Sequence, residues 1–165
     1  MYNGKDRVHG YKYQGLSAPD GIMLQMWGPF PGRRHDVAML RESGLLALLR
    51  EVFPEFGIYG DPAYPLSFIL VRPFRGAAVL PEAEASFNTE MSSVRESVEW
   101  GFGMLTNTWQ SFSFTRKEKM LERPLALYYQ VATLLMNCRT CMRGGNITST
   151  YFNLAPPSLE QYLMQ

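Results

Sequence analysis

The chain has 165 residues, of which 46% are hydrophobic and 13% aromatic, so it is long and apolar enough for one domain with a real core. Its net charge of +1 gives no global attraction to nucleic acid, so any DNA contact needs a local basic patch. Two cysteines and two histidines are too few for a disulfide framework or a four-ligand zinc site. Because no long apolar run and no secretory signal is present, we expect a soluble intracellular chain without a membrane span.

The first predicted elements are a hairpin and a helix. The runs "YKYQGLS" and "GIMLQMWGP" flank "APDG", a typical turn sequence, and this predicts a hairpin. Apolar residues at both alternating sets of positions in the second run indicate a strand covered on both faces. Asp36 is a good N-cap for a following helix, which Gly44 should weaken and Pro54 should end.

The second half of the chain predicts short strands and then long helices. Strands are expected around residues 57–61 and 68–73, and a helix between strands requires a crossover, hence an α/β fold with a mixed sheet. The clearest amphipathic helix runs from about 82 to 112. Another should start at Pro124 and end at Gly144.

Asp61 and Glu99 are the residues best suited to chemistry. Asp61 follows an apolar run, where a buried strand would end, and Glu99 lies on the long predicted helix. Metal-dependent phosphoryl transfer needs carboxylates that converge from separate elements on one or two divalent cations. The plainer alternative remains open: Asp61 forms a turn ahead of Pro62, and Glu99 pairs with Arg95 one helical turn earlier.

Several stretches, read together, resemble a known family. "KYQGLSAPDG", "GPFPGRRHDVAMLRESGLL", "YGDPAYPL", "PFRGA", "FNTEMSSVRESVEWGFGML" and "NCRTC" occur in the order in which they look like pieces of a Harbinger-type transposase nuclease, a DDE superfamily endonuclease. The resemblance covers about residues 2–143. It implies a partial endonuclease domain over 1–143 and a C-terminal tail over 144–165.

The resemblance implies an RNase H-like fold, a mixed sheet flanked by helices that brings three acidic residues to one Mg²⁺ or Mn²⁺ site. Asp61, in "GDPAYP", matches the second acidic position, and Glu99, in "VEWGFG", matches the glutamate. Family members carry the first aspartate in a short apolar strand upstream of the segment that here reads "YNGKDRVHGYKYQ". We therefore expect that the first strand and its aspartate are missing, and Asp6 and Asp20 are poor replacements.

Five further residues are candidates around this site. Asp36, in "GRRHD", is either an auxiliary metal ligand or simply a helix cap. The arginines near the site are candidates for contacts with DNA phosphates, or else are solvated loop residues: Arg33, Arg34, Arg72 and Arg75.

The sequence thus predicts a metal-dependent DNA endonuclease of the transposase type, impaired by the missing aspartate. The alternative is a domesticated noncatalytic module that binds DNA or protein. No helix-turn-helix is recognisable, so a separate DNA-binding partner protein and an oligomer both stay open. The family implies a nuclear location, although no basic cluster marks an import signal; otherwise the expectation is cytoplasmic.

Overall fold

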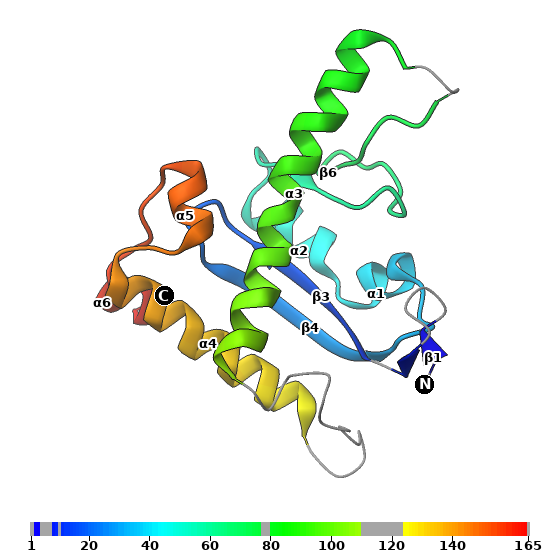
Figure 1. Ribbon diagram of the computed structural model, residues 1–165. Helices are drawn as coiled ribbons and strands as arrows, with labels where there is room; N and C mark the ends of the chain where they lie inside the picture. Colours follow the sequence, from blue (N-terminus) through cyan, green and yellow to red (C-terminus); the bar gives the residue numbers. More distant parts are fainter. Residues whose placement is uncertain (1, 4–7, 10, 77–79, 110–123, 165) are drawn as a thin grey trace. The chain divides into compact units, whose positions relative to one another are not determined.

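The computed structural model describes residues 2–3, 8–9, 11–76, 80–109 and 124–164. In chain order, the described strands β1 to β4 come first, followed by helices α1 and α2, strands β5 and β6, and helices α3 to α6 (Figure 1). Their bounds are β1 Tyr2–Asn3, β2 Val8–His9, β3 Tyr11–Ser17, β4 Met23–Pro31, α1 Asp36–Glu42, α2 Leu45–Val52, β5 Ile58–Tyr59, β6 Leu70–Val71, α3 Glu82–Thr108, α4 Leu125–Arg143, α5 Ile147–Phe152 and α6 Leu159–Leu163.

The described strands form three two-stranded sheets. β1 pairs with β2 in antiparallel fashion, β3 pairs with β4, and β5 pairs with β6 in parallel, with Ile58 opposite Leu70 and Tyr59 opposite Val71. The predicted mixed α/β class is therefore confirmed. The single RNase H-like sheet remains a prediction, as does a missing first strand.

The chain divides into two compact units. The first comprises Met1–Lys12 and Phe30–Glu96, and the second comprises Tyr13–Pro29 and Ser97–Gln165. The predicted division into a domain over 1–143 and a tail over 144–165 is a separate matter that stays a prediction.

In the first unit, the predicted helix after Asp36 is two helices, α1 and α2. Gly44 separates them because it adopts a left-handed backbone conformation, with φ of 64°. The Ser43 hydroxyl covers the break: it donates to the carbonyl of Leu40 at 2.9 Å and accepts from the amide of Leu45 at 3.3 Å. The glycine thus ends one helix and starts another, a stronger effect than the predicted weakening.

In the second unit, the predicted hairpin is present and packs on the two long helices. The turn is closed by the amide of Gly21, which donates to the carbonyl of Ala18 at 3.0 Å. Met23 and Met26 of β4 pack in one core cluster with apolar residues of α3 and α4: Leu105, Ala132 and Met136. The prediction that β4 is covered on both faces is wrong among the described residues, because Leu24 is 56% exposed.

The close approach of α3 to the hairpin depends on residues without side chains. A Cβ added at Gly101 would lie 2.5 Å from Cε of Met23, and one added at Gly15 would lie 2.9 Å from the ring of Phe102. Glycine at these positions therefore permits contacts that larger residues would block.

Polar contacts then fix the C-terminal helices of the second unit. Asn137 on α4 is buried; it accepts from the amide of Met23 at 3.0 Å and donates to the carbonyl of the same residue at 2.9 Å. Asn146 caps α5 and donates to the carbonyl of Gly21 at 2.8 Å. As predicted, α4 begins after Pro124 and ends at Gly144.

Candidate functional site: a pair of carboxylates around Tyr64

Asp61 lies two residues beyond the end of β5. The β5–β6 ladder continues past β5, because the amide of Gly60 donates to the carbonyl of Val71 at 2.8 Å. The chain then turns sharply: Oδ1 of Asp61 accepts from the amide of Ala63 at 3.0 Å, and the backbone carbonyl of Asp61 accepts from the amide of Tyr64 at 3.0 Å. Asp61 therefore does form the turn that the plainer alternative expected.

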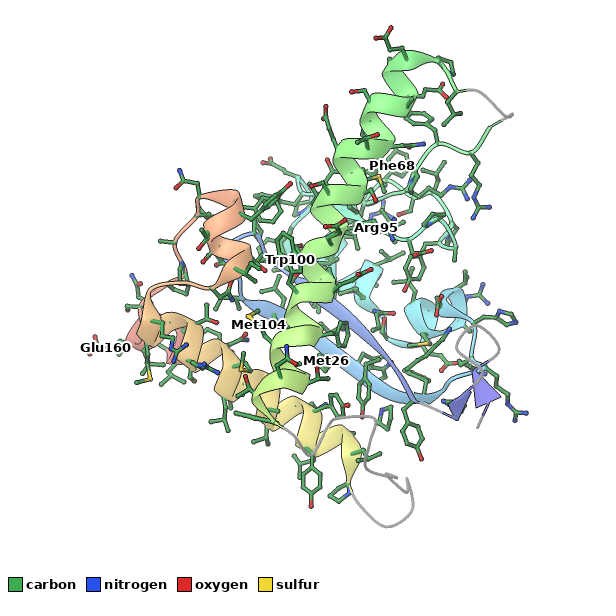
Figure 2. The ribbon with its side chains drawn as sticks, viewed as in Figure 1. Met26, Phe68, Arg95, Trp100, Met104 and Glu160 are labelled. Atoms are coloured by element: carbon green, nitrogen blue, oxygen red, sulfur yellow. The ribbon has the colours of Figure 1, made fainter. Side chains whose placement is uncertain are left out.

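The second carboxylate oxygen of Asp61 faces a cation on α3. Nη2 of Arg95 lies 3.2 Å from Oδ2 of Asp61, and the two side chains are 26% and 52% exposed. Figure 2 labels Arg95 on its helix. The plainer alternative paired Arg95 with Glu99, but the structure pairs it with Asp61 across 34 positions of sequence.

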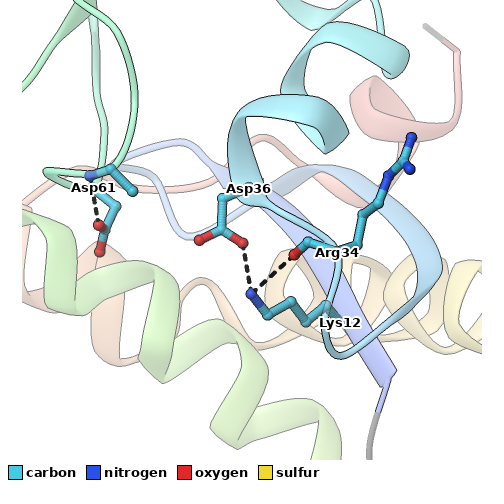
Figure 3. A network of polar contacts seen from close by, with 5 residues as sticks. Lys12, Arg34, Asp36 and Asp61 are labelled. Atoms are coloured by element: carbon cyan, nitrogen blue, oxygen red, sulfur yellow. Dashed lines mark hydrogen bonds and ion pairs between the residues drawn. The ribbon is translucent and has the colours of Figure 1, made fainter. Parts of the chain in front are cut away.

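Asp36 occupies the first turn of α1. The N-cap residue is His35, so the prediction that Asp36 is the N-cap is wrong by one position. Its carboxylate instead accepts from Nζ of Lys12 at 2.9 Å, and the same ammonium group donates to the carbonyl of Arg34 at 3.3 Å (Figure 3). A carboxylate in the first turn also interacts favourably with the helix dipole, which explains its place there.

Tyr64 connects the two carboxylates electrostatically. Burial, followed by the negative charges of Asp36 and Asp61, raises the pKa of Tyr64 to about 12 from its ordinary value of 10.0. The two carboxylates of the first unit thus act on the pKa of the same phenol. At neutral pH Tyr64 is a neutral hydrogen-bond donor beside two negative groups.

These oxygens have the chemistry that hard divalent cations prefer. Each carboxylate is already paired with a basic side chain, Lys12 or Arg95, which a cation would have to displace or share. Within the part of the chain that the structure describes, no group of three His, Cys, Asp or Glu side chains is placed to hold a metal ion. The first unit thus supplies two carboxylates, Asp36 and Asp61, each in an ion pair, and Glu99, exposed on α3, belongs to the second unit.

Two of the four predicted DNA-binding arginines support the Asp61 loop. Arg75 donates to the carbonyl of Pro62, and Nη1 of Arg72 lies 3.5 Å from the carbonyl of Tyr64. Arg34 forms an ion pair with Glu42. Arg33 is exposed in the turn before α1.

Sequence reasoning missed three residues of this site: Lys12, Tyr64 and Arg95. Tyr64 lies within the "YGDPAYP" stretch, close to Asp61 in sequence, so the sequence could have indicated that the two residues share a turn. Lys12 and Arg95 are ordinary charged positions on a strand and a helix, and only the tertiary structure places them against Asp36 and Asp61.

The comparisons agree with the sequence resemblance at the level of the family. The family described as DDE superfamily endonuclease matches residues 1–137. No curated protein and no solved structure matches the chain. Among the described helices, none has both the length and the apolar composition that crossing a membrane requires.

Proposed function

Because the chain belongs to the DDE superfamily endonucleases, we propose that it is a transposase-type nuclease domain of the Harbinger kind, with an RNase H-like fold. Its reaction is the cleavage and strand transfer of a DNA phosphodiester: the bond from phosphorus to one ester oxygen is replaced by a bond to a water or 3′-hydroxyl oxygen. The observation that supports this most is the placement of Asp61 just after β5, with Asp36 acting on the same phenol.

In this proposal Asp61 and Glu99 hold one or two Mg²⁺ or Mn²⁺ ions, with Asp36 as an auxiliary ligand. A divalent ion, when bound, stabilises negative charge on the phosphate and promotes ionisation of the attacking hydroxyl. Arg95 and Lys12 orient the carboxylates of Asp61 and Asp36 through their contacts at 3.2 and 2.9 Å. Tyr64 contributes a neutral hydroxyl group, a hydrogen-bond donor, to this part of the first unit.

Arg33 and Arg34 are the arginines we propose for gripping DNA phosphates. They precede Asp36 in the chain and are both exposed, and a DNA phosphate would share Arg34 with its ion-pair partner Glu42. Arg72 and Arg75 contribute indirectly, because their hydrogen bonds to the carbonyls of Tyr64 and Pro62 stabilise the loop that contains Asp61. A nuclear location and a separate DNA-binding partner protein fit this function.

A second candidate is a noncatalytic module that keeps the fold to bind DNA or protein. The specific observation in its favour is that Asp36 and Asp61 are each neutralised by a basic side chain. Because these ion pairs compete with a cation, metal binding is a more direct readout than nuclease activity.

The test is Mn²⁺ titration by calorimetry of the wild type and of the Asp61→Asn and Glu99→Gln variants. Both variants should lose at least about tenfold in affinity, because each removes a charged oxygen ligand. Glu51→Gln on α2 is the matched control, since Glu51 is also exposed but lies on another helix. Unchanged Mn²⁺ affinity in both site variants would show that the proposed metal site is wrong.

DNA binding is tested separately by fluorescence anisotropy with a labelled duplex. The Arg33→Gln and Arg34→Gln double variant should weaken binding and lower the salt dependence, because fewer counterions are released. Arg50→Gln, an exposed arginine on α2, is the control. The two tests can give different answers. If the carboxylate variants lose Mn²⁺ binding but the wild type does not bind DNA, the metal site is supported and the nuclease function is contradicted.

A further inference from the structure

The helix α4 has two apolar faces, and the described residues cover only one of them. The covered face packs toward α3 and β4 and contains the buried residues of the helix: Leu125, Ala132, Thr133, Met136, Asn137, Thr140 and Cys141. Six large apolar residues on the same helix are between 45% and 73% exposed: Leu127, Tyr128, Val131, Leu134, Leu135 and Met142. Together with the half-buried Cys138 we call them the α4 stripe.

The α4 stripe has the spacing of a helix–helix seam. Tyr128, Val131, Leu135, Cys138 and Met142 follow one another at alternating intervals of three and four positions, which is the heptad pattern of helices that pair along their length. Packing of the covered face does not explain this repeat, because the repeat lies on the opposite side of the helix. A solvated helix face would instead carry charged residues, and this stripe carries none.

The area of the stripe is large for a surface left in water. With about half of each side chain exposed, the stripe presents roughly 600 Å² of mainly apolar surface, at the upper limit of what monomeric proteins expose. Two such stripes facing each other would bury roughly 1,200 Å² in total, which reaches the size of a specific interface. Area by itself does not set the affinity, so the strength of the pair depends on how closely the two stripes fit together.

The charges on α4 indicate how two copies would pair. The helix has no acidic residue and no lysine, and its two arginines, Arg139 and Arg143, both lie near its C-terminal end. Parallel pairing would bring the four arginines of two copies together. Antiparallel pairing separates them and also places the positive N-terminal end of each helix dipole beside the negative C-terminal end of the other.

An antiparallel pair also gives the exposed Arg143 a partner. The middle of the stripe lies at Leu134 and Leu135, so a two-fold axis there places the C-terminal end of one helix against the N-terminal end of the other. Arg143 of one copy then comes beside the ring of Tyr128, which is 45% exposed, in the other copy. A guanidinium group over such a ring is favourable, and the same contact occurs twice by symmetry.

We propose that the α4 stripe is a homodimer interface in which two copies of this chain pair their α4 helices in antiparallel orientation about Leu134 and Leu135. The interface lies within the second unit and does not involve the carboxylates of the first. Its occurrence is therefore independent of the nuclease function proposed above.

The primary test is sedimentation equilibrium of the full chain from about 1 to 200 μM. We expect a monomer–dimer equilibrium, and Leu135→Lys should weaken it at least about tenfold because it places two like charges at the axis. The matched control is Leu48→Lys on α2, a leucine with 54% exposure outside the stripe. A wild type that stays monomeric at 200 μM, or equal effects of the two variants, would overturn the proposal.

A charge exchange separates loss of the interface from loss of folding. Leu135→Lys and Leu135→Glu chains should each be monomeric, and their equimolar mixture should restore the dimer, because opposite charges then meet at the axis. Chains that were merely unfolded would not recover on mixing. A mixture that stays monomeric would count against the proposal as directly as a monomeric wild type.

Cross-linking tests the orientation. In an antiparallel pair Val131 faces Cys138 of the other copy, whereas the two Cys138 residues are offset by about seven positions, or about 10 Å. Mild oxidation should therefore cross-link the Val131→Cys variant into a dimer and leave the wild type uncross-linked. A disulfide through Cys138 in the unmodified chain would show a parallel pair and overturn the orientation.

Discussion

The ion pair between Asp61 and Arg95 leads to a quantitative prediction for a double-mutant cycle. Nη2 of Arg95 and Oδ2 of Asp61 are 3.2 Å apart, and the side chains are 26% and 52% exposed, so water screens the attraction only in part. Exposed pairs of this kind couple by about 0.2 to 1 kcal/mol. Because Arg95 is the more buried partner, we expect a coupling of about 0.5 to 1 kcal/mol at low salt.

The assay is urea unfolding of four proteins: wild type, Asp61→Asn, Arg95→Gln and the double variant. Asparagine retains an oxygen that can accept from the amide of Ala63, so the turn is preserved while the charge is removed. In 1 M salt the Debye length is about 3 Å, close to the separation of the pair, and most of the coupling should disappear.

Arg50 on α2 provides the control for this cycle, because it is exposed and its pairing with Asp61 is not among the ion pairs of the described residues. The Arg50→Gln variant combined with Asp61→Asn should be additive within error. A coupling below about 0.2 kcal/mol for Asp61 and Arg95, or one that does not respond to salt, would refute the proposed electrostatic role of Arg95.

Three more outcomes test the packing and electrostatics of the two units. The folded state raises the pKa of Tyr64 to about 12 from 10.0, so the contribution of Tyr64 to the free energy of unfolding is complete below pH 10 and is lost as the pH rises toward 12. The free energy of unfolding of the Tyr64→Phe variant should not show this fall across the same pH range. Gly60→Ala should lower the free energy of unfolding by about 1 kcal/mol or more, because the new Cβ would lie 3.0 Å from a buried leucine side chain. Gly103→Ala has open space around its Cβ and should raise the free energy of unfolding by about 0.5 to 1 kcal/mol in the same urea assay. Asn137→Ala should cost about 2 to 3 kcal/mol in thermal or urea unfolding, because it leaves both backbone groups of Met23 buried and unpaired; a cost below about 1 kcal/mol would contradict that reading.

The sequence predicted best where a local rule decides the structure. The turn at Ala18–Gly21, the long α3 helix and the limits of α4 follow from glycine, proline and apolar spacing, and all three were confirmed. The placement of Asp61 just after a strand likewise followed from an apolar run that ends before proline, but the prediction that this strand is buried is wrong, because Tyr59 is 48% exposed.

The sequence could not predict features that depend on contacts between distant segments. Arg95 could have paired with Glu99 on its own helix, and only the folded unit brings it to Asp61 instead. Helical spacing continued through Gly44, so the periodicity concealed the break that its left-handed conformation produces. The apolar alternation of β4 could not show that Leu24 faces solvent.

The central claim is that the carboxylates around Tyr64 take up a divalent cation. The most direct measurement is NMR of the chain with ¹³C-labelled tyrosine during Mn²⁺ titration, because the paramagnetic ion broadens signals only from nuclei close to it. We predict early broadening of the Tyr64 signal in the wild type and its loss in the Asp61→Asn variant. A Tyr64 signal that stays sharp in the wild type, or broadens equally in both proteins, would contradict the claim.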